Sequence, residues 1–293
     1  MRYTVISALV FSALAAPGVA QTMEDVVTIS SAAGPFIGTL ATPAGDPAPA
    51  VLLLHGFTGS RNELPTDAVP EGIFARTAAR LAEAGYASLR IDFRGSGEST
   101  SELSYADTTF EGQVADALAA LDYLAGSDKV AGDDLFIIGW SQGGLVATAA
   151  AGRSDIPDAV ALWAAVADPE QTYGDLLGAE VMTAGMAAAA DEAVTAALPW
   201  GAEVALKGGF FDGIESYDPT GEIAGYAGPL LVAQGSLDTT VLPVSADLLI
   251  AAHEGPEELW TAEMDHTFNA FATDATLEEM IAATIGFFDA AAD

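Results

Sequence analysis

Residues 135–144 read LFIIGWSQGG and place a serine between an apolar run and a helix-forming segment. The run Leu135–Trp140 predicts a strand buried on both faces, and Gln142–Ala151 predicts the helix that follows it. Glycines two positions before and after the serine let these two elements approach closely. The helix also directs its positive N-terminal end at the turn, which favours a negatively charged oxygen there. We therefore expect Ser141 to be presented as a nucleophile.

Outward from this turn, strands and helices alternate along most of the chain. A short hairpin is expected first, and the repeated strand–helix–strand units after it predict an α/β fold with a mostly parallel sheet and helices on both faces. The strands are expected at 26–30, 36–41, 50–54, 87–93, 135–140, 159–166, 230–234 and 259–262, and the helices at 73–84, 110–124, 142–151, 244–252 and 277–290.

Residues 168–227 interrupt this alternation. Their first half is rich in alanine but carries acidic residues, so it cannot span a membrane. The second half carries Trp200-Gly201, then Val204–Leu206, Gly208-Gly209 and Phe210-Phe211, and predicts a small hairpin. An insertion of this size is typical of a cap over the carboxyl edge of the sheet, where ligands of open α/β sheets bind. The expected division is a core of residues 21–167 and 228–293 with a cap at 168–227.

A serine nucleophile needs a base and a carboxylate that orients the base. His266 lies in the loop between the last expected strand and the last helix, and Asp238 follows the strand 230–234 at its carboxyl end. The chain order Ser141, Asp238, His266 is the order found when the nucleophile sits on a strand-to-helix turn. Asp265 competes with Asp238 for the orienting role, but adjacent residues cannot easily face each other's side chains.

Two backbone amides are candidates to stabilise an oxyanion beside the serine. One is the N–H of Gln142, directly after Ser141, and the other is the N–H of Phe57 in the sequence HGFTG at 55–59. Each donor contributes about 3 kcal/mol in a transition state of this kind. His55 is then expected to brace its loop, and His253 to cap its helix or face solvent. The segment 92–99 is expected to form a structured turn near the mouth of the site.

Composition excludes several classes of function. The chain has 293 residues, 51% of them hydrophobic, which is ample for a buried core. Nine basic and 42 acidic side chains give a net charge of −33, which disfavours nucleic acid as a partner. The absence of cysteine excludes disulfides, thiolate metal sites and a cysteine nucleophile. With three histidines there are few ways to build a metal site, and we expect neither a metal nor a cofactor. The acidity suggests a saline habitat, or simply a well-solvated surface.

The N-terminus has the pattern of a signal peptide over residues 1–20. Met1-Arg2 is followed by an apolar stretch too short for a bilayer and then by Gly18 and Ala20 at the positions that a signal peptidase recognises. We expect a secreted or periplasmic protein with no stable membrane association after cleavage; the alternative is a membrane-tethered N-terminus. Removing residues 1–20 takes away Arg2 and no acid, so the charge becomes 8 − 42 = −34.

Taken together, five motifs resemble the α/β-hydrolase superfamily over nearly the whole chain after residue 20. They are most similar to those of bacterial cinnamoyl and feruloyl esterase-like carboxylesterases, and the cap resembles that group's inserted hairpin. One departure is Trp140, where many relatives carry a histidine beside the serine. The motifs are HGFTGSRNE at 55–63, DFRGSGES at 92–99, GWSQGG at 139–144, GSLD at 235–238 and DHTF at 265–268.

The resemblance implies a carboxylesterase that hydrolyses a small-molecule ester, with a short-chain or hydroxycinnamoyl-type acyl group, through an acyl-enzyme. It implies Ser141 as nucleophile, His266 as base and Asp238 as orienting acid, with Phe57 and Gln142 as oxyanion donors. Three alternatives share the scaffold: a lipase, a serine peptidase and a non-catalytic binding protein. An intact Ser141, Asp238 and His266 set argues against the last of them.

Overall fold

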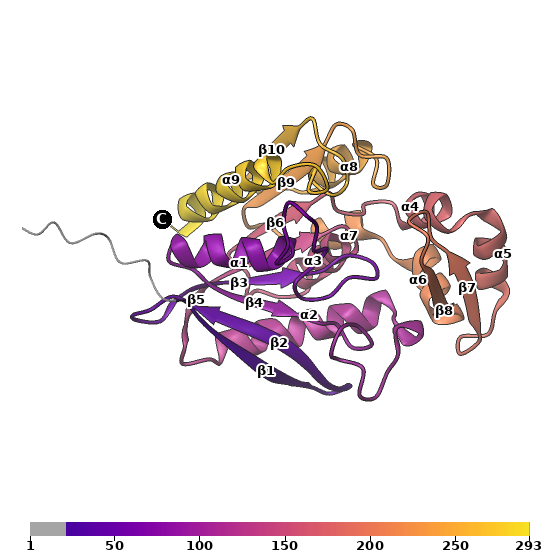
Figure 1. Ribbon diagram of the computed structural model, residues 1–293, viewed down its shortest axis with the longest axis horizontal. Helices are drawn as coiled ribbons and strands as arrows, with labels where there is room; N and C mark the ends of the chain where they lie inside the picture. Colours follow the sequence, from indigo (N-terminus) through magenta and orange to yellow (C-terminus); the bar gives the residue numbers. More distant parts are fainter. Residues whose placement is uncertain (1–21, 293) are drawn as a thin grey trace, which may run out of the picture.

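The core of the molecule is a sheet whose central strands are buried on both faces. The computed structural model describes residues 22–292. Eight strands follow the spatial order β1-β2-β4-β3-β5-β6-β9-β10, antiparallel between β1 and β2 and between β2 and β4, and parallel elsewhere. The predicted opening hairpin and mostly parallel sheet are therefore confirmed (Figure 1). The strands are β1 (Met23–Ser31), β2 (Gly34–Thr42), β3 (Ala48–Leu54), β4 (Ala87–Ile91), β5 (Val130–Trp140), β6 (Ala159–Trp163), β9 (Leu230–Gly235) and β10 (Glu257–Ala262).

Helices cover both faces of this sheet because successive side chains of a buried strand point to opposite sides. On β3, Leu52 and Leu54 belong to the apolar cluster that includes α2 and α3, whereas Val51 and Leu53 belong to the cluster that includes α1 and α9. All five helices predicted for the core are present. They are α1 (Ile73–Glu83), α2 (Phe110–Ala125), α3 (Gln142–Gly152), α8 (Val244–Ala252) and α9 (Ala275–Ala292), and a short 3-10 helix, η1 (Tyr105–Asp107), precedes α2.

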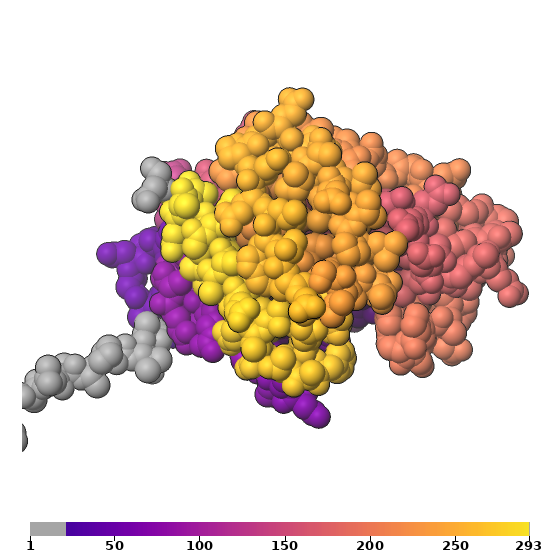
Figure 2. Space-filling view, turned by 90° about the horizontal axis from the view of Figure 1, so that it is seen from above, coloured from indigo at the N-terminus to yellow at the C-terminus, as the bar shows by residue number. Residues whose placement is uncertain are grey.

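Between β6 and β9 the chain builds a separate group of elements, which we call the cap segment, residues 168–227. Most of it projects from one end of the molecule (Figures 1 and 2), whereas its last helix, α7, packs on α3 of the core. The elements are α4 (Pro169–Leu177), α5 (Ala179–Ala187), β7 (Ala193–Ala197), β8 (Glu203–Lys207), α6 (Gly208–Ser216) and α7 (Pro219–Ile223), with β7 and β8 paired as an antiparallel hairpin.

The predicted position of the cap hairpin is wrong in one respect. The partner of β8 is the preceding segment β7, and Phe210 and Phe211 lie in helix α6. Buried Phe210, Phe211 and Ile214 have helical spacing, which places them on one face of that helix. Strand β7 could not be recognised in the sequence because three of its five residues are alanines, which have low β propensity.

The predicted signal peptide, residues 1–20, lies outside the described residues. Within residues 22–292, no helix combines the length and the hydropathy that crossing a bilayer requires.

Candidate active site

Ser141 occupies the strained turn between β5 and α3. Its backbone has φ 56° and ψ −116°, a conformation that L-residues rarely adopt. A Cβ atom at Gly143 would overlap the carbonyl oxygens of Leu54 and His55, and one at Gly139 would overlap the carbonyl oxygen of Gly143. The glycines thus allow α3 to approach the ends of β3 and β5, and the serine side chain is left at the carboxyl edge of the sheet.

The structure brings Ser141, His266 and Asp238 together. The Nε2 atom of His266 lies 3.0 Å from Ser141 Oγ, and its Nδ1 atom lies 2.8 Å from Asp238 Oδ2. A neutral imidazole in this position donates its Nδ1–H to the carboxylate and accepts the serine hydroxyl proton at Nε2. The other carboxylate oxygen of Asp238 accepts the backbone N–H groups of Thr240 (2.8 Å) and Val241 (2.9 Å), which orient the carboxylate.

The side chain of Asp265, the competing carboxylate, forms hydrogen bonds within its own loop. Its Oδ1 accepts the backbone N–H groups of Thr267 and Asn269, both at 2.9 Å. The carboxylate that meets the His266 ring is therefore Asp238.

The other two histidines are buried away from the serine. His55 donates its Nδ1–H to Gly56 O (2.9 Å) and accepts the Phe93 N–H at Nε2 (3.3 Å), so it braces its loop as expected. Burial lowers the pKa of His55 to about 4, which keeps the ring neutral in this arrangement. His253 is the C-cap of helix α8, as one of the two expectations had it, and it packs on the ring of Tyr226. Because it is buried, the other expectation, that it faces solvent, is wrong.

The loop 55–59, which we call the oxyanion loop, lies beside the serine. A Cβ atom at Gly56 would lie 3.5 Å from Ser141 Cβ. The N–H of Gly56 is bonded to Glu63 Oε2 (2.8 Å), and the N–H of Thr58 is bonded to the hydroxyl of Tyr105 (2.7 Å). Between them, the N–H of Phe57 has no acceptor within residues 22–292, and the same holds for the N–H of Gln142. Both predicted donors are thus free to bind an oxyanion.

Glu63 is a part of this site that sequence reasoning missed. Its side chain is buried, and burial raises its pKa to about 8, with a further contribution from the negative charge of Asp92. The hydrogen bond from Gly56 acts in the opposite direction. Glu63 stands in a polar loop sequence, SRNE, where an exposed carboxylate would be the ordinary expectation. Only the packed structure shows that it lies under the oxyanion loop.

The expected turn at 92–99 is present and borders the site. Asp92 is fully buried and accepts the backbone N–H groups of Arg61 (2.7 Å) and Glu98 (2.9 Å). Its carboxylate also pairs with the guanidinium of Arg61, which links this turn to the segment following the oxyanion loop. Gly97 of the turn lines the cavity that contains the serine.

That cavity has a volume of about 780 Å³ and lies between the core and the cap segment. Two exposed aromatic side chains border it, Trp200 from the cap hairpin and Phe271 from the loop before α9. Within the described residues, no lysine or arginine lines it. The lining consists of Gly56, Phe57, Thr58, Gly59, Ser60, Glu63, Leu64, Pro65, Gly97, Trp140, Ser141, Val166, Thr172, Tyr173, Leu176, Trp200, Thr240, His266, Thr267 and Phe271.

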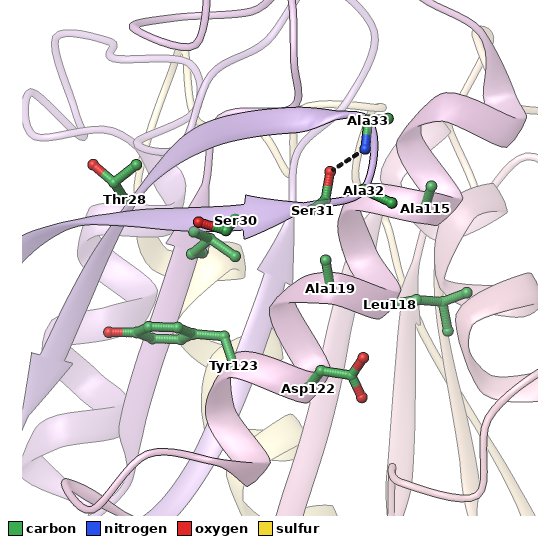
Figure 3. Close-up of a pocket in the computed structure, with 11 residues that line it drawn as sticks. Thr28, Ser30, Ser31, Ala32, Ala33, Ala115, Leu118, Ala119, Asp122 and Tyr123 are labelled. Carbon is green, nitrogen blue, oxygen red and sulfur yellow. Dashed lines mark hydrogen bonds between the residues drawn. The ribbon is translucent and has the colours of Figure 1, made fainter.

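A second hollow, of about 640 Å³, lies between the β1–β2 turn and helix α2 (Figure 3). Its lining includes Asp122 and Tyr123 but no histidine, so it lacks a nucleophile with a base. Across residues 22–292, no three His, Asp or Glu side chains are grouped so as to hold a metal ion. The cavity that contains Ser141 and His266 is therefore the candidate active site.

Comparisons with known proteins agree with the observed fold. The sequence model of the α/β hydrolase fold matches residues 49–210. No curated protein matches the sequence significantly. Among solved structures, Est1E from Butyrivibrio proteoclasticus is 23% identical, with a TM-score of 0.70, covering 91% of this chain and 98% of that one.

Two further structures are similar over comparable lengths. Est1E with ferulic acid bound is 24% identical, with a TM-score of 0.72 and coverage of 89% of this chain and 97% of that one. The esterase domain of a Rhodothermus marinus protein is 22% identical, with a TM-score of 0.66 and coverage of 90% and 97%. At these identities the likeness shows a shared fold.

Proposed function

The chain belongs to the α/β-hydrolase fold family, and from this premise we propose that it hydrolyses carboxylic esters with Ser141 as the nucleophile. The observation that carries the proposal is the position of His266, which lies within hydrogen-bond distance of both Ser141 Oγ and Asp238 Oδ2. A nucleophile, a base and a group that orients the base are the parts required for acyl transfer.

The reaction proceeds through an acyl-enzyme. Ser141 Oγ attacks the ester carbonyl carbon while its proton moves to His266 Nε2, and Asp238 stabilises the resulting imidazolium. The N–H groups of Phe57 and Gln142 bind the oxyanion of the tetrahedral intermediate. When the intermediate collapses, the carbon–oxygen bond to the alcohol breaks and His266 returns the proton to that alcohol. A water molecule, deprotonated by His266, then releases the carboxylic acid and restores the serine.

The cavity supports a neutral ester with an apolar or aromatic acyl group. Phe57, Trp140, Leu176, Trp200 and Phe271 supply apolar surface, and its volume of about 780 Å³ is within the range of small-molecule sites. The absence of basic side chains from the described lining disfavours substrates that carry a carboxylate. Short-chain acyl and hydroxycinnamoyl-type esters both meet these conditions. The ferulic acid bound to Est1E, a protein of the same fold, is consistent with the second class.

The proposal is tested by turnover of p-nitrophenyl acetate together with labelling by a fluorophosphonate. Wild-type protein is expected to hydrolyse the ester and to take the label at Ser141. Ser141→Ala is expected to lose the label and to reduce kcat by about 10⁶-fold, because this residue forms the covalent bond. Wild-type activity in Ser141→Ala would show that the assignment is wrong. A panel of p-nitrophenyl acyl chains, methyl ferulate and a long-chain triglyceride then identifies the acyl group and separates an esterase from a lipase.

The orienting carboxylate is tested by a matched pair of variants. Asp238→Asn is expected to reduce kcat by about 10³- to 10⁴-fold, because the amide cannot stabilise the imidazolium and favours the wrong tautomer of His266. Asp265 is next to His266 in the sequence, but its carboxylate forms hydrogen bonds within its own loop. Asp265→Asn is therefore expected to reduce kcat less than tenfold. The reverse ranking would assign the orienting role to Asp265.

A further inference from the structure

One cap side chain contacts both residues whose backbone amides flank the serine. Tyr173, on helix α4, is 1% exposed. Its hydroxyl donates a hydrogen bond to Gln142 Oε1, and its ring meets the ring of Phe57 edge-on, with 5.6 Å between the centroids. Tyr173 therefore connects the cap segment with both sides of the predicted oxyanion hole.

The contact to Gln142 is part of a buried hydrogen-bonded chain. The side-chain amide of Gln142 accepts from Tyr173 and donates to Gln113 Oε1 (2.7 Å), and Gln113 in turn donates to Thr108 Oγ1 (3.2 Å). The side chains of Gln142 and Gln113 are almost completely buried. Burial raises the pKa of Tyr173 well above its ordinary value, so the hydroxyl is protonated and able to donate at neutral pH. Gln142 is thus held from two directions at the first residue of α3.

The contact to Phe57 holds the other donor. The Phe57 ring is surrounded by Tyr105, Tyr173 and Phe210, the last two from the cap segment, at centroid distances of 5.6–5.9 Å. The neighbouring amides on either side of Phe57 are bonded to Glu63 and Tyr105. The orientation of the Phe57 N–H therefore depends on packing from the cap as well as on hydrogen bonds within the core.

We propose that Tyr173 is a positioning residue through which the cap segment aligns the two oxyanion donors, Phe57 N–H and Gln142 N–H. This inference rests on the proposed function. Oxyanion donors accelerate a reaction because they are already oriented before charge develops, and small displacements of such groups cost much of their effect. Loss of the Tyr173 hydroxyl removes one of the two hydrogen bonds that hold the Gln142 side chain.

The test compares Tyr173→Phe with wild-type protein on p-nitrophenyl acetate. We expect kcat to fall about tenfold with KM within about twofold, because the loss affects the transition state and not the ground state; one mispositioned donor costs less than the loss of a whole donor. Affinity for a trifluoromethyl ketone, which forms a tetrahedral adduct with an oxyanion, is expected to fall by a similar factor. A purely structural role would lower thermal stability and leave kcat and the ketone affinity unchanged.

Tyr217→Phe is the matched control. Tyr217 is also in the cap segment, and its ring packs on Phe110, as does the ring of Tyr173. Within the described residues the Tyr217 hydroxyl has no hydrogen-bond partner, so its removal breaks no bond. This variant is expected to keep the kcat and the ketone affinity of wild-type protein. An equal loss in both variants would overturn the proposal.

A double-mutant cycle tests whether Tyr173 acts through Gln142. In a Gln142→Leu background, Tyr173→Phe is expected to have little further effect on kcat, because the hydrogen bond is already gone. Independent, multiplicative losses would overturn the coupling. If wild-type protein neither turns over the ester nor takes the fluorophosphonate, the proposed function itself fails and this inference with it. If wild-type protein is active and Tyr173→Phe matches it, only the inference fails.

Discussion

Glu63 is a buried carboxylic acid whose surroundings disfavour its ionised form. Its carboxyl group lies against the oxyanion loop, accepts one backbone N–H from Gly56, and is close enough to Asp92 to be repelled by it. Burial is the largest contribution to the increase in its pKa to about 8. The protonated form is therefore favoured in the folded protein at neutral pH, whereas the unfolded chain ionises near its ordinary pKa of 4.5.

This difference predicts how stability changes with pH. Between about pH 4.5 and 8 the folded state binds the Glu63 proton more tightly than the unfolded state does. The contribution of this residue therefore lowers the free energy of unfolding as pH rises, by at most about 1.4 kcal/mol per pH unit. Glu63→Gln carries no titrating proton. Its stability relative to wild-type protein is expected to increase from pH 5 to 8 and to change little above that. Urea unfolding of both proteins at several pH values measures the difference, and a constant difference would contradict the prediction.

At the scale of elements, the turn from β5 to α3 depends on close approach of backbones. Gly143 lies in α3 where an added Cβ would overlap two carbonyl oxygens at the end of β3. Those atoms are backbone atoms of Leu54, the last residue of the buried strand β3, and of His55, the residue after it, and they cannot move aside cheaply. The close packing of this helix therefore positions Ser141 and also contributes to the stability of the central sheet.

Gly143→Ala is accordingly expected to destabilise the protein by about 3 kcal/mol or more, through overpacking against backbone. Gly286 provides the comparison, because it lies within helix α9 and a Cβ there would meet no heavy atom within 4 Å. Gly286→Ala is expected to stabilise the protein by about 0.5–1 kcal/mol, since alanine favours a helix. Free energies of unfolding from urea titrations measure both changes. Similar effects of the two substitutions would show that helix propensity, and not close approach, dominates at position 143.

The cap segment shows a second property at this scale. Its helix α4 begins at Pro169 after Asp168, whose side chain accepts the N–H of Gln171 (2.9 Å), so the start of the helix is specified locally. Tyr173 one turn later is then directed at Gln142 by the packing of aromatic rings from three other elements. A local capping signal thus positions a helix whose function comes from distant contacts.

Over the whole molecule, charge is strongly unbalanced. Each lysine and arginine within residues 22–292 forms an ion pair with a carboxylate. The chain contains 42 acidic and nine basic residues, so most carboxylates have no cation to pair with. Repulsion between unpaired carboxylates on the surface therefore opposes folding at low ionic strength.

Added salt is expected to stabilise the protein. Sodium chloride shortens the Debye length from about 10 Å at 0.1 M to about 3 Å at 1 M, which weakens the long-range repulsion more than the short ion pairs. We expect Tm to rise by a few degrees over this range, where about 1 kcal/mol corresponds to 2–4 °C in a protein of this size. Thermal melts at increasing sodium chloride concentration measure the effect. A constant or falling Tm would show that the acidic surface has no such energetic cost.

The overall fold could be predicted from the sequence because its signals are local. Apolar runs with flanking glycines specify buried strands, and the chain order of Ser141, Asp238 and His266 follows from which strands precede which loops. The same local signals indicated the turn at 92–99 and the bracing role of His55. The cap hairpin was misplaced because the alanine-rich β7 has no local strand pattern.

Contacts between distant segments are harder to predict from the sequence than strands and helices are. Such contacts depend on how several elements pack together and not on the residue pattern of any one element. Packing brings Asp238, which the chain order already favoured over the adjacent Asp265, into contact with His266. It also buries Glu63 beneath the oxyanion loop and brings Tyr173 to Gln142 across 31 positions of the chain. No periodicity or motif predicted the contacts of Glu63 and Tyr173, since each depends on the shapes of several packed elements at once.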